Sequence, residues 1–174
     1  MHRRTLLAAA FCLPWLPAWA VGGPAPDASL LAIQGAWRGE LRYRDYRSDK
    51  QLTLPSRLYV TLLGPSAIAL ALIYDDGPGK TVYAYEQMKF HFDHGEMHWL
   101  NGGDAAGTTP GGTALRIVLD TLSPTGRKLV LEGQEKDFLA RYTLDFGAAA
   151  LILQKEEVRN GQVLLRNRHT FSRP

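Results

Sequence analysis

Apolar and polar positions alternate with a period of two along the first stretch of the chain that predicts regular structure. From Trp37, apolar or small residues at 37, 39, 41 and 43 alternate with charged residues at 38, 40, 42 and 44. This period predicts a strand with one face on a core and the other in water. The stretch 67–75 is nearly all apolar, and small alanines alternate there with large side chains. We expect its alanines to leave space inside the core.

Turn-forming residues divide the rest of the chain into further strands. Gly64-Pro65, Asp76 to Gly79, Ser123 to Gly126 and Asn160-Gly161 are sequences typical of tight turns. A helical turn is expected at 29–34, ahead of the first strand. The expected strands are residues 37–46, 52–63, 67–75, 81–92, a partner strand beginning at 96, then 114–122, 128–134, 138–146, 149–156 and 162–172.

Short turns make consecutive strands antiparallel neighbours, so the connections favour one architecture. About ten such strands hide their edges best by closing on themselves. We therefore predict an all-β chain that forms a single antiparallel up-and-down β-barrel. A two-sheet β-sandwich is the alternative, but its crossing connections need longer loops than this chain offers. The one long loop, 101–112, is expected to cover the barrel mouth as a lid.

The hairpin around residue 94 carries a candidate metal site. A two-residue turn at 94–95 predicts that His91 lies opposite His98 and that Phe90 lies opposite Trp99. Opposed residues have Cβ atoms about 5 Å apart, close enough for two imidazoles to share a zinc or copper ion. A solvated hairpin tip is the competing interpretation, and no metal is assigned.

The N-terminal segment is predicted to be an export signal. Residues 1–20 contain two adjacent arginines, then an apolar run, then a small-x-small sequence that favours cleavage near Ala20. The paired arginines are compatible with a Sec or a twin-arginine signal. We expect a periplasmic or secreted protein with a linker and short turn at 21–34 and a barrel domain at 35–174.

Removal of this segment changes the composition. The only cysteine, Cys12, lies within the signal, so the mature chain lacks thiol chemistry and disulfides. Cleavage removes two arginines, so the mature chain has 18 Lys and Arg residues against 17 Asp and Glu residues. This small excess of positive charge gives no reason to expect nucleic-acid binding. No later stretch is apolar enough to predict a membrane span. No Gly-x-Ser-x-Gly sequence occurs, and we predict no catalytic residues and no enzyme activity.

The start of the first strand resembles a known group of barrels. Gly35-x-Trp37-x-Gly39, with arginines on the last strand, resembles the calycin group, which includes the lipocalins. Lipocalins carry a helix after the barrel, whereas the sequence here ends with its last predicted strand, and residues 46–51 cannot hold the two helices of fatty-acid-binding proteins. The chain therefore looks most like the plain ten-stranded barrels of the nitrobindin heme proteins. The resemblance implies that Trp37 closes one end of the barrel, and that Arg168, or else Arg166, packs across its indole.

The same resemblance implies a heme alternative. Nitrobindin-like proteins ligate heme through a histidine near the C-terminus, and His169 is the matching residue. Strict alternation along 162–172 places His169 on the opposite face from Arg168, so both point inward only if a bulge intervenes. No cofactor is assigned.

The aromatic content gives the main functional prediction. We expect an exported lipocalin-like barrel that binds a small apolar ligand in its lumen, as a monomer or small homo-oligomer. The alternatives are heme binding through His169, and a filled barrel that acts as an envelope or protein-interaction module. Asp45, Glu86 and Asp145 are the acids that the pattern allows on an inward face. The predicted ligand-binding residues are Trp37, Tyr43, Tyr74, Phe90, Trp99, Tyr142 and His169.

Overall fold

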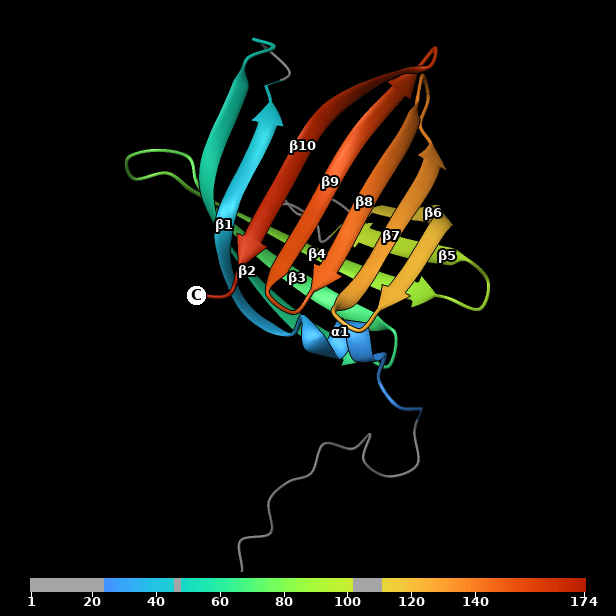
Figure 1. The fold of residues 1–174 in the computed structure, drawn as a ribbon. Coiled ribbons are helices and arrows are strands. Elements are labelled where there is room, and N and C mark those ends of the chain that lie inside the picture. Colours follow the sequence, from blue (N-terminus) through green and yellow to red (C-terminus); the bar gives the residue numbers. More distant parts are fainter. Residues whose placement is uncertain (1–23, 46–47, 102–110) are drawn as a thin grey trace, which may run out of the picture.

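Ten antiparallel strands close into one barrel (Figure 1). The computed structural model describes residues 24–45, 48–101 and 111–174. Each strand pairs with its neighbours in the chain, and β1 pairs with β10 to complete the closure. The strands are β1 (Gly35–Arg44), β2 (Gln51–Gly64), β3 (Ala67–Asp75), β4 (Thr81–His91), β5 (Glu96–Asn101), β6 (Gly111–Ser123), β7 (Gly126–Gln134), β8 (Leu139–Gly147), β9 (Ala150–Arg159) and β10 (Gln162–Ser172).

The predicted all-β up-and-down barrel is therefore confirmed, and the sandwich alternative is wrong. The expected strand boundaries agree with the observed ones to within a few residues. The predicted signal and most of the lid loop lie outside the described residues. No helix in the described part of the chain is long and apolar enough to cross a membrane.

A short helix closes one end of the barrel. The helix α1 (Ala28–Ala32) begins where the Asp27 carboxylate accepts hydrogen bonds from the backbone N–H groups of Ser29, at 2.9 Å, and Leu30, at 3.3 Å. Leu30 and Ile33 have no exposed surface and pack into the barrel end. Figure 1 shows α1 lying across the end of the barrel. The helical turn expected at 29–34 thus lies where it covers one mouth.

Trp37 lies beneath this helix, in the core of the closed end. Its indole is 1% exposed, and its Nε1–H donates a 2.8 Å hydrogen bond to the Ile33 carbonyl oxygen. Phe90, Phe146 and Phe171 are each at most 1% exposed and belong to the same core. The closed half of the lumen is thereby filled with apolar side chains.

The two glycines beside Trp37 have separate structural roles. Gly35 has a φ of 113°, a conformation that favours glycine. Gly39 lies so close to β10 that a Cβ atom there would be 1.8 Å from the Thr170 carbonyl oxygen. The backbones of β1 and β10 therefore approach each other where the barrel closes.

An arginine does pack over Trp37, but it is Arg173 rather than Arg168 or Arg166, and Arg166 forms an ion pair with Glu157 instead. The Arg173 guanidinium carbon lies 4.0 Å from the indole centroid, and its nitrogens donate to the carbonyl oxygens of Gln34, at 2.9 Å, and Ala32, at 2.7 Å. The prediction for Arg168 is wrong because alternation along β10 points that residue to the outer face, between the inward Asn167 and His169.

A buried arginine ties the helix to the barrel wall. Arg127 donates from Nε to Asp120 at 2.8 Å and from a terminal nitrogen to Asp27, the cap of α1, at 2.7 Å. Its guanidinium also lies 3.5 Å from the centroid of the Phe92 ring. Because one cation joins the helix cap, β6 and an aromatic ring, the closure is electrostatic as well as apolar.

Two predictions about register and facing are wrong. His91 lies opposite Glu96, not His98, and Phe90 lies opposite Met97, not Trp99, because four residues form the turn. His94 N–H donates to the His91 carbonyl oxygen in this turn at 3.1 Å. On β3 the alanines do not leave space in the lumen. Leu72 pairs with the buried Leu58, and this places the large residues of β3 inward and its alanines outward.

Candidate functional site

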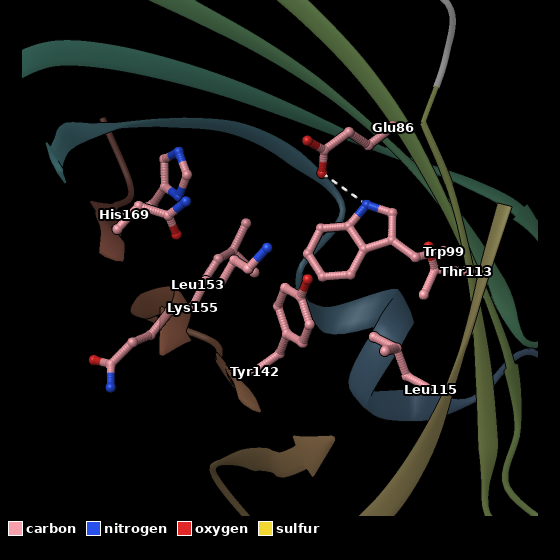
Figure 2. A pocket seen from close by; sticks show the side chains of 10 residues that line it. Glu86, Trp99, Thr113, Leu115, Tyr142, Leu153, Lys155 and His169 are labelled. Carbon is pink, nitrogen blue, oxygen red and sulfur yellow. Dashed lines mark hydrogen bonds between the residues drawn. The ribbon is translucent and has the colours of Figure 1, made fainter. Parts of the chain in front are cut away.

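A cavity of about 250 Å³ lies in the lumen beyond the filled closed end (Figure 2). Because side chains alternate along each strand, one inward residue from each of several strands reaches the same level of the barrel. The lining residues are Glu86 of β4, Trp99 of β5, Thr113 and Leu115 of β6, Tyr142 of β8, Leu153, Gln154 and Lys155 of β9, and Asn167 and His169 of β10.

An aromatic pair forms one wall of the cavity. The ring centroids of Trp99 and Tyr142 are 5.1 Å apart, with the ring planes tilted by 52°. Trp99 Nε1–H donates a 3.0 Å hydrogen bond to Glu86 Oε2, drawn as a dashed line in Figure 2. Trp99 thus presents its ring to the cavity while its polar edge is satisfied.

Glu86 is an acid inside the barrel with no cationic partner among the described residues. Burial raises the pKa of its carboxyl group above the ordinary value, and the hydrogen bond from Trp99 acts in the opposite direction. Burial also raises the pKa of the Tyr74 hydroxyl group, and the negative charge of Glu86 adds to this effect. Glu86 therefore supplies a hydrogen-bonding group that the barrel does not neutralise.

Lys155 is the cation of the cavity, and it is paired. Its Nζ lies 2.8 Å from Glu135 Oε1 and 5.4 Å from the Tyr142 ring centroid. Burial lowers the pKa of Lys155, but the hydrogen bond and charge of Glu135 and the contact with Tyr142 outweigh it, so the pKa is raised. Lys155 therefore remains charged.

His169 points inward, as predicted, but it is engaged with Tyr74. Its Nε2 lies 3.1 Å from the Tyr74 hydroxyl oxygen, and its buried Nδ1 has no hydrogen-bond partner among the described residues. Burial lowers the pKa of His169 to about 4. The nearby Leu153 backbone opposes this shift, although it does not form a hydrogen bond of normal geometry.

These contacts do not fit an axial heme ligand. The Nε2 atom already contacts Tyr74, and the cavity of about 250 Å³ is smaller than the pockets of roughly 300–1,000 Å³ that hold drug-sized ligands. Heme is larger than most such ligands, so heme binding would require the barrel to rearrange.

The structure divides the predicted ligand-binding residues into two groups. Trp99, Tyr142 and His169 line the cavity, and Tyr74 adjoins it through His169. Tyr43 is half-buried on β1, opposite the cavity residue Asn167, but does not line the cavity itself. Trp37 and Phe90 do not line it either, because both belong to the packed closed end, and their prediction as ligand contacts is corrected.

Sequence reasoning missed most of the polar lining. Of the three candidate inward acids, only Glu86 lines the cavity; Asp145 alternates with the buried Leu144 and Phe146 and faces outward. Lys155 and Asn167 were not identified. The signal for Lys155 was its parity with the buried Leu151 and Leu153, and the signal for Asn167 was its parity with the inward His169 on β10.

The histidine pair of the β4–β5 hairpin points to the outer face of the barrel wall, whereas Trp99, the neighbour of His98, points into the lumen. The rings of His91 and His98 are 5.1 Å apart, as diagonal rather than opposed neighbours. Within the described ranges, no three His, Cys, Asp or Glu side chains gather as they would around a metal ion.

This chain is similar to known proteins in structure but not in sequence. No family model matches the chain, and no curated protein matches it. Rv2717c from M. tuberculosis is similar in structure, with a TM-score of 0.59 and 11% identity over 86% of this chain and 99% of that one. The S-type phycobiliprotein lyase CPES from Guillardia theta has a TM-score of 0.56 and 12% identity, over 83% of this chain and 90% of that one.

What this chain shares with both structures is the fold, the closed antiparallel barrel described above. At such low identity the likeness shows the fold alone.

Proposed function

We propose that this lipocalin-like barrel binds a small organic molecule in its lumen and does not transform it. The observation that carries the proposal is the change in lining along the barrel. Apolar side chains fill the closed end, whereas the cavity combines the aromatic pair Trp99 and Tyr142 with Glu86, Lys155 and Asn167. An apolar wall with a few convergent polar groups is typical of ligand sites.

The lining indicates the chemistry of the ligand. A flat ring packs against Trp99 and Tyr142, and a hydrogen-bond donor on that ring reaches Glu86, whose only hydrogen bond within the described chain comes from Trp99. Lys155 is already neutralised by Glu135 and attracts an anion less strongly. The ligand is therefore a small aromatic molecule with a donor group, more polar than the apolar ligand expected from the sequence.

The competing function is that of a filled barrel acting through its outer surface. The cavity favours ligand binding, because a barrel that acts only as a scaffold gains nothing from an unfilled polar lumen. A ligand-binding barrel should be stabilised by a small molecule that fits the cavity, whereas a barrel that acts only through its outer surface should not.

Indole and 1-methylindole test the proposal, since they differ in the N–H donor. We expect indole to raise the Tm of the protein, and 1-methylindole to raise it less. Thr113→Phe fills the cavity and abolishes both effects, whereas Thr121→Phe, at an exposed position of the same strand, retains them. If neither indole nor other ring compounds of this size shift the Tm, the lumen is not a binding site.

We also propose that the protein acts outside the cytoplasm. The support is the pattern of residues 1–20 described above. Expression of the full chain followed by cell fractionation and N-terminal sequencing should give a periplasmic product beginning near Val21. Arg3→Lys combined with Arg4→Lys blocks export only if the twin-arginine route is used. A full-length product in the cytoplasm contradicts export.

A further inference from the structure

The outer face of the barrel carries two pairs of arginines placed opposite each other. The register of β1 and β2 puts Arg38 opposite Arg57, and the register of β1 and β10 puts Arg42 opposite Arg168. Alternation points all four away from the lumen, because their neighbours Trp37, Leu58 and His169 point into it. Directly opposed residues have Cβ atoms about 5 Å apart, so like charges at these positions destabilise the sheet.

None of these four arginines forms an ion pair within the described residues, and Glu40, which lies between Arg38 and Arg42 on the same face of β1, forms none with them. Six other arginines of that part of the chain form ion pairs: Arg44, Arg116, Arg127, Arg141, Arg159 and Arg166. The unpaired guanidinium groups of Arg38 and Arg57 therefore keep their full set of donors for an external group. A guanidinium matches phosphate and carboxylate oxygens with two parallel hydrogen bonds.

One of the two pairs also faces a hollow. Arg38 and Arg57 line an open depression of about 640 Å³, where β2 and β3 meet the β3–β4 turn. Pro55 and Ile73 give this hollow an apolar wall. Arg42 and Arg168 do not line it, so the second pair has the same charges without the recess.

The other charged groups of the hollow leave it positive. Lys80 lines it and forms an ion pair with Asp76 of the same turn. Asp75 also lines it, and its Oδ1 accepts a 3.3 Å hydrogen bond from Gly77 N–H. Two unpaired arginines against one acid give a positive potential that attracts anions.

We propose that this hollow binds a phosphate monoester, with the dianionic head between Arg38 and Arg57 and an apolar body against Pro55 and Ile73. A dianion satisfies both guanidinium groups at once and replaces their mutual repulsion with attraction. An organic group on the phosphate adds contact with the apolar wall, so an ester binds more tightly than inorganic phosphate. This site is separate from the lumen cavity and does not depend on the function proposed for it.

The test compares phenyl phosphate, inorganic phosphate and benzoate by calorimetry on the full chain at constant ionic strength. We expect phenyl phosphate to bind most tightly and benzoate most weakly. Arg38→Gln combined with Arg57→Gln should weaken phenyl phosphate binding about tenfold or more, because two charge-assisted contacts are lost. Asp75→Asn should tighten it.

Arg42→Gln combined with Arg168→Gln is the matched control, since it removes the same charge from the same face. We expect it to change phenyl phosphate binding less than about twofold. Equal losses in the two double variants would show a diffuse charge effect and overturn the site. Failure of phenyl phosphate to bind wild-type protein would overturn it too.

A stability measurement distinguishes loss of the site from loss of the fold. At low salt without phosphate, the Arg38→Gln and Arg57→Gln double variant should have a Tm equal to or above that of wild type, because the opposed charges are gone. With phenyl phosphate, only wild type and the control variant should gain Tm. A double variant whose Tm rises with phenyl phosphate as much as that of wild type would contradict the proposal.

Discussion

Protonation of His169 should make the barrel less stable in mild acid. Burial holds its pKa at about 4, whereas the unfolded chain has the ordinary value of 6.5. The unfolded state therefore binds a proton first as the pH falls, and the folded state loses stability between about pH 6.5 and pH 4. From the two pKa values, the loss at pH 5 is about 2 kcal/mol and approaches about 3 kcal/mol at pH 4.

The groups around the ring affect the measured profile. Glu86 has a raised pKa, so its protonation favours the folded state in acid and partly offsets the effect of His169. Tyr74 has its pKa raised by burial and stays neutral throughout this range, and Lys155 stays charged. The contribution of His169 is therefore obtained as a difference between two proteins that share these groups.

Urea unfolding at pH 7.5, 6 and 5 measures this difference for wild type and His169→Gln. A glutamine retains a hydrogen-bonding group near Tyr74 but does not titrate. We expect wild type to lose about 2 kcal/mol more than the variant between pH 7.5 and pH 5. Thr170→Ala, an exposed position on the same strand, should keep the wild-type pH dependence. Parallel profiles for wild type and His169→Gln would refute the argument that burial holds the ring neutral.

Three further substitutions test the closure of the barrel. Trp37→Ala should cost about 3–5 kcal/mol, measured by urea unfolding; a variant with the stability of wild type that loses only ligand binding would contradict its role in the core. Gly39→Ala should cost about 3 kcal/mol or more, because the Cβ atom meets the β10 backbone, and near-wild-type stability would contradict the close approach. Arg127→Met should cost about 1–3 kcal/mol and speed amide exchange in α1, since Asp27 and Asp120 lose their partner; unchanged exchange would show that the helix is held by apolar contacts alone.

Local patterns in the chain were sufficient to predict the architecture. Turn sequences such as Asn160-Gly161 and the alternation after Trp37 depend only on neighbouring residues, so they can be recognised in the sequence without knowledge of the fold. Once ten strands with short turns are recognised, closure follows from the need to pair every edge. The inward direction of Trp99, Tyr142 and His169 also follows from alternation within single strands.

Features that depend on how two or more strands pair could not be predicted from the sequence. The four-residue turn after His91 changed the partner of that residue, and the irregularity after Leu165 changed the parity of β10. Arg173 reaches Trp37 from beyond the last strand, where no period exists to place it.

The polar cavity and the opposed arginines also could not be predicted from the sequence, because each brings together residues from several strands. Glu86 and Lys155 enter one lumen only when the barrel closes, and Arg38 opposes Arg57 only in the observed register. Turn chemistry and alternation act over a few residues and set where the strands lie. Register and closure act across the whole barrel, and they determine which side chains meet.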